Sequence, residues 1–384
     1  MWINHVSLNN FRNYTEVQLD LNPKINLFVG QNAQGKSNFL ESVELMSLGK
    51  STRSANDMDL IMHNKTGLII EAEFQDEPWA KNIKISFTKQ SNEKIAKSFI
   101  VNSFEHKTRK SVLGHLLCVS FKSQDLNLTQ SSPKYRRDWL DNIACLISIP
   151  YLETLINLDK LLKQKNALLR NFNHGIKASF NDNLDIYNQQ ISLVGAKIIK
   201  FRLKTLSRIH EYAKANLLDI SNNADDLDVN YLLTSNSAKN TYNELLQIPQ
   251  EDIAQLLMND LTSIRPLEIL RKQSLIGPQR HDIDFMVNAK SAKGFASQGQ
   301  QRSLVLALKL AELQLLEDKF NQKPVLLLDD VLAELDNQRQ EQLLRKISLG
   351  SQAIITTVSV DYLPPYLFKN ANIFNVVGGQ IQKS

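Results

Sequence analysis

Three separated stretches of the chain fit the parts of one nucleotide site, and they constrain the fold more than any other feature. The first is the glycine-rich segment 30–37, which matches the pattern GxxxxGK[ST]. The second is SQGQQR at 297–302, and the third is the apolar run 325–328 followed by Asp329 and Asp330. Because the outer two lie toward opposite ends of the chain, one α/β core must be assembled from both ends.

The first stretch has the context of a phosphate-binding loop, because an apolar strand is expected at 25–29 and a helix after it. In such loops backbone N–H groups surround the phosphates, the lysine reaches the β and γ oxygens, and the serine hydroxyl holds Mg²⁺. The alternative is a chance glycine-rich turn. The residues expected to bind ATP are Gly30, Gln31, Asn32, Ala33, Gln34, Gly35, Lys36, Ser37 and Asn38.

The third stretch predicts a buried strand that ends in carboxylates at the sheet edge beside the phosphate loop. Asp329 is expected to orient Mg²⁺ together with Ser37. Asp330 is expected to polarise the attacking water as a general base, with Lys36 as its catalytic partner. Two solvated loop aspartates would be the alternative if the phosphate loop were not in the same chain.

The second stretch has two interpretations. Ser297 and Gln300 form an S-x-x-Q capping box before a helix expected to extend to about residue 320. Capping does not explain Gly299 or the place of this turn before the carboxylate strand. The hydroxyl of Ser297, with Gly299 and Gln300 at the helix N-terminus, is therefore predicted to meet the γ-phosphate held by a second subunit.

Three further polar residues are candidates for the same site. Asp336 is expected to reach across the subunit interface or to cap the next helix, and both roles are compatible. Thr357 ends a later strand, where its hydroxyl is expected to be a weak sensor of the γ-phosphate. Gln124 is expected to be a Mg²⁺-linked glutamine or a polar loop residue.

The order of strand-like and helix-like patterns along the chain predicts an α/β protein with an inserted helical arm. Residues 1–124 and 267–384 alternate strands and helices, while 125–266 carries long helical patterns with few glycines. The first two segments are predicted to form one ATPase head, with an antiparallel β subdomain from alternating strands such as 68–74 and 83–87.

Composition indicates which partners and which cellular compartment suit the protein. The net charge of +5 permits an anionic partner without requiring one. Cys118 and Cys145 lack metal-ligand or CxxC spacing, so buried thiols in a reducing cytoplasm are expected. No signal peptide or window of about 18 apolar residues is present, which predicts a cytoplasmic protein without a membrane partner.

The motifs together resemble the ABC-type ATPase heads of the SMC family. The resemblance also includes NFRNY at 10–14, STR at 51–53, SPKYRR at 132–137 and KQKNALL at 163–169. Two stretches depart from the pattern of the nearest members. Where those members have GPHRDD the chain has GPQRHD at 277–282, and where they have PEDL it has SQDL at 123–126.

The resemblance implies a DNA-binding recombination mediator that dimerises with ATP and hydrolyses it slowly. It adds Arg12 to the nucleotide-binding residues, and it implies work with RecO and RecR to load RecA at gapped DNA, in repair, replication restart and the SOS response. Another SMC-like ATPase, or the nucleotide-binding subunit of a transporter, is the alternative. Such a subunit carries a much shorter insertion than this chain does.

Basic side chains suggest where DNA would bind. Lys197, Lys200, Lys204 and Arg208 recur at helical spacing and predict either one DNA-binding stripe or a solvated helix face. No helix-turn-helix, zinc finger or aromatic RNA-binding motif is present, so sequence-specific reading is not expected. The further candidates for DNA contact are Arg53, Lys134, Arg136 and Arg137.

Overall fold

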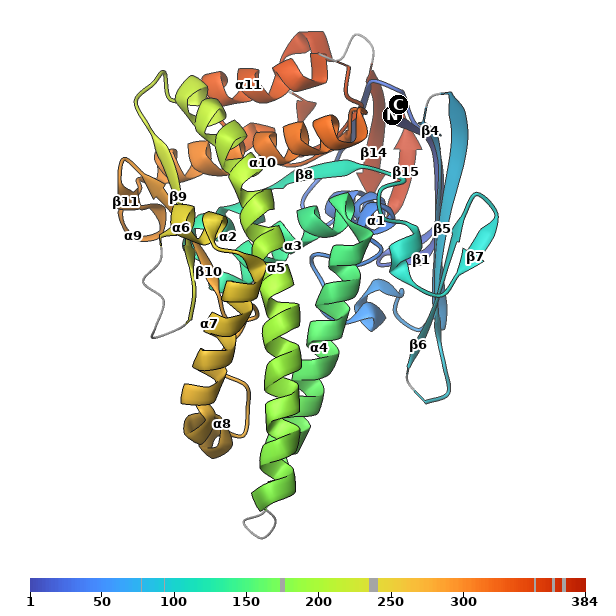
Figure 1. Cartoon of the computed structure of the whole chain (residues 1–384). Helices are drawn as coiled ribbons and strands as arrows, with labels where there is room; N and C mark the ends of the chain where they lie inside the picture. The colour runs from blue at the N-terminus through green and yellow to red at the C-terminus, as the bar shows by residue number, and fades with distance from the viewer. Residues whose placement is uncertain are drawn as a thin grey trace. The chain divides into compact units, whose positions relative to one another are not determined.

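The computed structural model describes residues 1–76, 78–92, 94–172, 177–234, 241–348, 350–360, 363–367 and 371–384. Contacts divide the chain, which Figure 1 draws whole, into two compact units. The head unit contains Met1–Asp125 and Leu306–Ser384, and the arm unit contains Leu126–Val305. Within the described residues, no helix is long and apolar enough to cross a membrane.

The head unit contains two six-stranded sheets. The antiparallel sheet has the order β2-β1-β4-β5-β6-β7, from β1 (Trp2–Phe11), β2 (Tyr14–Asp20), β4 (Gly67–Asp76), β5 (Trp79–Lys89), β6 (Ile95–Val101) and β7 (Phe104–His106). The second sheet has the order β15-β14-β3-β13-β12-β8, from β3 (Ile25–Val29), β8 (Cys118–Lys122), β12 (Val325–Asp329), β13 (Ala353–Thr357), β14 (Ala371–Val377) and β15 (Gln380–Lys383). All its pairings are parallel except that of β14 with β15.

The burial of the strands explains these two arrangements. Residues of β4 alternate between the core and a wetter face, which suits an antiparallel sheet with one exposed side. Val325–Leu328 of β12 are all buried, as expected for a strand covered on both faces. Helix α1 (Lys36–Leu48) packs against strands of both sheets, and Phe39, Val43 and Met46 join one hydrophobic core with them.

The arm unit is mainly helical. It contains α2 (Asn127–Gln130), α3 (Pro133–Ile147), α4 (Ile149–Arg170), α5 (Lys177–Ile220), α6 (Tyr242–Gln247), α7 (Gln250–Ser263), α8 (Arg265–Arg271) and α9 (Ala292–Phe295). Helices α4 and α5 lie side by side, with α7 against α5 (Figure 1). At 1.5 Å per residue, α4 and α5 are about 33 and 66 Å long, which confirms the long helical patterns expected in this segment.

A small sheet in the arm unit was not predicted in full. Strand β10 (Asp282–Val287) pairs on one side with β11 (Lys290–Ser291) and on the other with β9 (Leu227–Leu232), which lies in the segment predicted to be helical. This pairing ties residues after 267 to the arm. The contact boundary therefore falls at Leu306, whereas the sequence predicted the head to resume at residue 267.

Two helices follow the small sheet. Helix α10 (Gln298–Phe320) begins in the arm unit and continues into the head unit, and α11 (Asn337–Ser348) follows β12. Both start directly after residues that the sequence analysis assigned to the nucleotide site. The predicted strands at 25–29 and 325–328 form in the head unit as β3 and β12, and Thr357 ends β13 as expected. Parallel pairing gathers the carboxyl ends of these strands at one edge of the sheet.

Candidate nucleotide site

The loop between β3 and α1 is shaped by contacts that only glycine permits at its two ends. A Cβ on Gly30 would lie 2.4 Å from the carbonyl oxygen of Val376, so β14 approaches the loop too closely for a side chain. Gly35 has φ +122°, in the region that favours glycine. The Tyr14 hydroxyl donates to the carbonyl of Gly35 at 2.8 Å. Segment 30–35 therefore enters α1 with a defined backbone.

Lys36 is 4% exposed and turns back over this loop. Its Nζ donates to the carbonyl oxygens of Gly30 at 2.7 Å and Gln31 at 3.3 Å, and it lies 3.8 Å from a carboxylate oxygen of Asp330. An ammonium held here is placed to compensate negative charge beside the loop.

Ser37 meets the carboxylate strand, from which it is separated by most of the chain. The Ser37 hydroxyl donates to Oδ1 of Asp329 at 2.7 Å, because β12 and the loop end at the same edge of the parallel sheet. A hydroxyl and a carboxylate oxygen are the hard donors that Mg²⁺ prefers, so this pair fits a magnesium ion.

Thr356 is a site residue that the sequence analysis missed. Its hydroxyl donates to Oδ1 of Asp329 at 2.9 Å and accepts the N–H of Asp330 at 2.9 Å. Asp330 has φ +54°, an uncommon conformation for a residue with a side chain, and this bond helps to hold it. Asp329 and Thr356 are paired across β12 and β13, a register that sequence alone does not disclose.

Thr357, which the sequence pattern favoured as the hydroxyl sensor, does not bond to Asp329. It is 3% exposed, and its hydroxyl donates to the carbonyl of Ser359 at 2.7 Å. Successive side chains of a strand point to opposite faces, so Thr356 and Thr357 cannot both face Asp329. The backbone carbonyl of Thr357 accepts the N–H of Gly30 at 3.2 Å, which links β13 to the loop.

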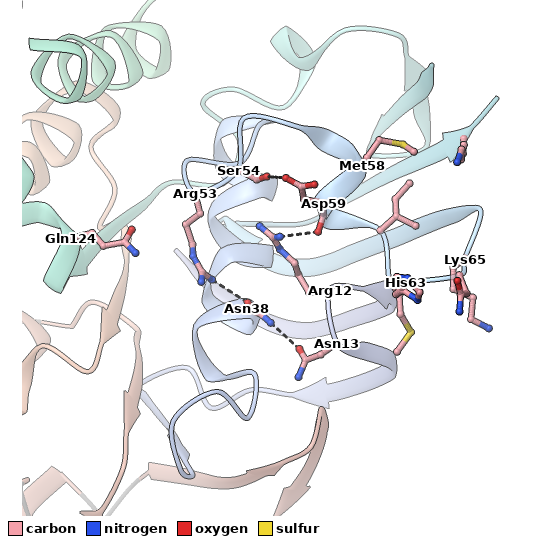
Figure 2. Close-up of a pocket in the computed structure, with 14 residues that line it drawn as sticks. Arg12, Asn13, Asn38, Arg53, Ser54, Met58, Asp59, His63, Lys65 and Gln124 are labelled. Atoms are coloured by element: carbon pink, nitrogen blue, oxygen red, sulfur yellow. Dashed lines mark hydrogen bonds between the residues drawn. The ribbon is translucent and has the colours of Figure 1, made fainter. Parts of the chain in front are cut away.

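A pocket of about 890 Å³ adjoins Asn38, the residue after Ser37 (Figure 2). Arg12, Asn13 and Arg53 line it, together with apolar residues that include Ile61. Gln124, on the turn Ser123–Leu126, is exposed and reaches the pocket from a different element than Arg12 and Asn38 do.

Glu41 of α1 holds two of the cations that line this pocket. Arg12 makes two bonds to its carboxylate, at 2.8 and 3.0 Å, and donates to the carbonyl of Asp59 at 2.7 Å. Arg53 lies 3.3 Å from the same carboxylate and donates to the side-chain oxygen of Asn38 at 3.1 Å. Both guanidinium groups are therefore held near the start of α1.

A second buried carboxylate, Glu44, links α1 to β8. Lys122 donates to it at 2.7 Å and Ser120 at 2.8 Å. Burial by itself would raise the pKa of Glu44, but the Lys122 ammonium and these hydrogen bonds hold it below its ordinary value. The carboxylate stays charged, so α1 is tied to the strand that leads into the turn bearing Gln124.

Ser297 shows the geometry of a capping box. Its hydroxyl accepts the N–H of Gln300 at 3.2 Å, and its own N–H donates to the Gln300 side-chain oxygen at 3.0 Å. The Gln300 amide nitrogen also donates to Asp225 at 2.7 Å. Ser297 is exposed, whereas Gly299 and Gln300 are half-buried. The capping interpretation is thus realised, and it leaves the Ser297 side chain accessible.

Asp336 also adopts its capping role. Its carboxylate accepts the N–H of Arg339 at 2.9 Å at the start of α11 and is bonded to the Arg339 side chain as well. The side chain is exposed, so the cap does not remove it from the surface.

The predicted DNA-binding residues fall into two groups. Lys134, Lys197, Lys204 and Arg208 are exposed. The prediction for Arg136 is corrected, since it is 2% exposed and its guanidinium makes bonds of 2.8 and 2.9 Å to Asp282.

Arg137 and Lys200 are partly committed inside the arm unit. Arg137 donates to the carbonyl of His281 at 2.7 Å. Lys200 donates to the carbonyls of Leu246 and Ile248 at 2.8 and 2.7 Å, so it caps the end of α6. Burial of Lys200, followed by the neighbouring charge of Lys204, lowers its pKa. The predicted stripe on α5 is therefore interrupted at this position.

The chain is similar to proteins of known family over its whole length. Residues 2–374 match the family described as RecF/RecN/SMC N terminal domain. The DNA replication and repair protein RecF of Clostridium botulinum (strain Okra / Type B1) is 36% identical over 384 residues, covering 100% of both chains. The protein of the same description from Lysinibacillus sphaericus (strain C3-41) is 34% identical, also over 100% of both chains.

Solved structures agree with this relationship. A structure of the recombination mediator protein RecF-ATP in the RecFOR pathway is 30% identical with a TM-score of 0.88, covering 100% of this chain and 97% of that one. An Smc head domain from Pyrococcus furiosus, 16% identical with a TM-score of 0.51 over 100% of this chain and 96% of that one, shares the fold alone. The predicted fold class, an ABC-type ATPase head with an inserted helical arm, is confirmed. On this evidence the chain belongs to the RecF family of SMC-like ATPases.

Proposed function

We propose that this protein is an ATP-dependent, DNA-binding recombination mediator that acts as a switch. The observation that carries the proposal is the 2.7 Å bond between Ser37 of the phosphate loop and Asp329 of the carboxylate strand. It joins the two halves of an ATP site, in a chain whose relatives are described as replication and repair proteins and as a recombination mediator.

In the proposed bound state, residues 30–38 surround the phosphates and Lys36 moves from the loop carbonyls to the β and γ oxygens. Ser37 and Asp329 would hold Mg²⁺, with Gln124 as a further candidate. When bound, the ion would neutralise part of the phosphate charge. The pocket lined by Arg12 and Asn38 offers a cationic and partly apolar surface for the nucleoside.

Hydrolysis is proposed to be slow, as the family resemblance implies, and one carboxylate is proposed to carry the proton chemistry. Asp330 accepts a proton from the attacking water, and Lys36 stabilises the charge that develops on the γ-phosphate. Thr357 donates its hydroxyl to the Ser359 carbonyl, so a sensing role would require that bond to break.

Dimerisation is proposed to complete the site. The exposed hydroxyl of Ser297, with Gly299 and Gln300 at the start of α10, is offered to ATP on a second copy, where the positive end of the helix dipole favours an anion. Asp336 reaches the same interface. In this scheme segments 1–124 and 267–384 act as one ATPase head and 125–266 as its arm.

DNA is proposed to bind without sequence preference through Lys134, Lys197, Lys204 and Arg208, with Arg53 as a candidate on the head. The proposed setting is the cytoplasm, with RecO and RecR as partners in loading RecA at gaps and in SOS induction. The reduced, buried Cys118 and Cys145 fit a reducing compartment.

The switch is tested by trapping it. Asp330→Asn keeps the shape of the side chain but removes the base, so we expect ATP and Mg²⁺ to accumulate a dimer measured by light scattering. Adding Ser297→Arg should block that dimer while leaving ATP binding by the monomer within about twofold. A dimer that persists in the double variant would remove Ser297 from the interface.

The DNA function is tested by binding to duplex, single-stranded and gapped DNA with and without ATP across a salt series. We expect ATP to increase affinity for the gapped substrate, with a steep loss of affinity as salt rises. Binding that ignored both ATP and salt would contradict the proposal.

A further inference from the structure

The phosphate loop is held from outside by two turns that lie far apart in the sequence. The backbone carbonyl of Gln34 accepts the side-chain amide of Asn13 at 2.9 Å, from the turn between β1 and β2. It also accepts the N–H of Gly379 at 3.0 Å, from the turn between β14 and β15. The side-chain oxygen of Gln34 accepts the N–H of Gly378 at 2.6 Å. Three donors thus converge on one loop residue.

These hydrogen bonds affect the direction of the backbone N–H groups that a phosphate loop offers to phosphate. In a trans peptide the carbonyl of one residue points opposite to the N–H of the next. Holding the Gln34 carbonyl against Asn13 and Gly379 therefore directs the N–H of Gly35 away from the two turns. The Tyr14 hydroxyl on the Gly35 carbonyl does the same for the N–H of Lys36. The turns fix donors before a phosphate arrives.

The fit between the turns is tight at one glycine and open at the next. A Cβ on Gly379 would lie 2.3 Å from the backbone oxygen of Asn13, a contact that no flexible side chain could relieve. Gly378, with φ +55° against +77° for Gly379, would meet nothing within 4 Å. Strand β14 also touches the other end of the loop, through Val376 and Gly30.

We propose that the turn at Gly378 and Gly379, together with Asn13, is a clasp that preorganises the phosphate loop and sets how long ATP stays bound. Gly379 and Asn13 are positioning residues, since they act through Gln34. The inference rests on the proposed ATP site and extends it to the hairpin of β14 and β15, which carries no nucleotide-binding motif. A loop already in its binding conformation loses less entropy on binding.

The test compares two alanine substitutions in the full-length protein. Gly379→Ala places a methyl group against Asn13, whereas Gly378→Ala adds the same group at a similar φ in open space and keeps its N–H. We expect Gly379→Ala to speed dissociation of a fluorescent ATP analogue, with Mg²⁺ present, at least tenfold. Gly378→Ala should change the rate less than threefold. Equal rates in two variants with similar melting temperatures would overturn the clasp.

A second pair covers the case in which Gly379→Ala does not fold. Gln34→Ala removes the side-chain acceptor for Gly378, and we expect dissociation to become about threefold faster. Gln380→Ala, an exposed residue of the same hairpin, should match the parent protein. An unchanged rate in Gln34→Ala would overturn the proposal. Failure of the parent chain to bind the analogue at all would instead refute the ATP site itself.

Discussion

The head and arm units use positive charge in different ways. Around the nucleotide site, Lys36 and Arg12 bond to groups that converge on one loop and one pocket. In the arm unit, Arg202 is buried with bonds to Asp141, and Lys165 is buried 2.6 Å from Glu268, while Lys197, Lys204 and Arg208 face solvent. In the head, the sequence motif around a cation shows what the cation binds. In the arm, whether a cation pairs with a carboxylate or faces solvent depends on its burial.

The cost of burying charge explains the contrast. A buried ion pair is tolerated only when its geometry and hydrogen bonds are good, and removing one partner leaves the other uncompensated. Arg202 meets this condition with two bonds of 2.8 Å to Asp141 and one of 2.7 Å to the carbonyl of Pro278. Such residues connect helices of the arm and are unavailable to DNA.

The largest expected effect lies in the head. Lys36→Met should lower ATP affinity at least about a thousandfold, roughly 4 kcal/mol, because the only change is loss of the ammonium placed over the phosphate loop. Nucleotide binding by calorimetry measures this. Lys24→Met, at an exposed position before β3, should bind ATP normally. If well-folded Lys36→Met kept its high affinity for ATP, the role that the motif assigns to this cation in the head would be wrong.

Arg136→Met should destabilise the arm by about 3 kcal/mol, since the half-buried Asp282 would lose a buried bidentate partner. Thermal or urea unfolding reports the change. Lys134→Met on the same helix, where the side chain is 74% exposed, should shift stability by less than about 0.5 kcal/mol. Loss of DNA affinity in Arg136→Met without loss of stability would restore it as a DNA contact.

Thr356→Val should raise the Mg²⁺ concentration needed for ATP binding about tenfold, because Asp329 and the N–H of Asp330 both lose a partner. Titration of Mg²⁺ against a fluorescent nucleotide measures this. Thr356→Ser, which retains the hydroxyl, should recover most of the loss. Identical Mg²⁺ dependence in the valine and serine variants would show that only packing matters here.

The arm should also be sensitive to acid through His281. Burial, followed by the charges of Arg202 and Arg137, lowers the pKa of His281 to about 3. Below a pH of about 6.5, His281 binds a proton in the unfolded chain but not in the folded chain. The free energy of unfolding therefore falls as pH falls. We expect about 1 kcal/mol to be lost between pH 7 and 5.5. The His281→Asn variant should lose about 1 kcal/mol less stability than the parent protein over this pH range. An equal loss in both proteins would show that His281 does not cause the acid sensitivity.

The smallest effect separates members of one helical stripe. Lys204→Gln or Arg208→Gln should weaken DNA binding about threefold and reduce the salt slope by about 0.9 for each phosphate that the variant no longer neutralises. Lys200→Gln should leave the slope unchanged, since its ammonium caps α6, and should lower stability instead. A salt slope unchanged from that of the parent protein in all three variants would show that the stripe is a solvated face.

Much of the head could be predicted because its signals are local. The strand at 25–29, the glycine-rich loop and Asp329 each follow from patterns a few residues long, and the predicted strands at 25–29 and 325–328 both form. Strand β9 was missed because its pairing partner β10 lies about fifty residues further along the chain, where a helical background gave no cue. That pairing places residues 282–287 in the arm unit, after the head boundary predicted at residue 267.

The sequence by itself determined the chemistry of the site, since a phosphate loop and a carboxylate strand are each specified by adjacent residues. Only the tertiary structure decided which hydroxyl of Thr356 and Thr357 faces Asp329, and that Arg136 is buried rather than exposed to DNA. It also placed the turn at Gly378 against Gln34. The physical reason is that strand register and burial depend on contacts between distant segments, which no short pattern encodes.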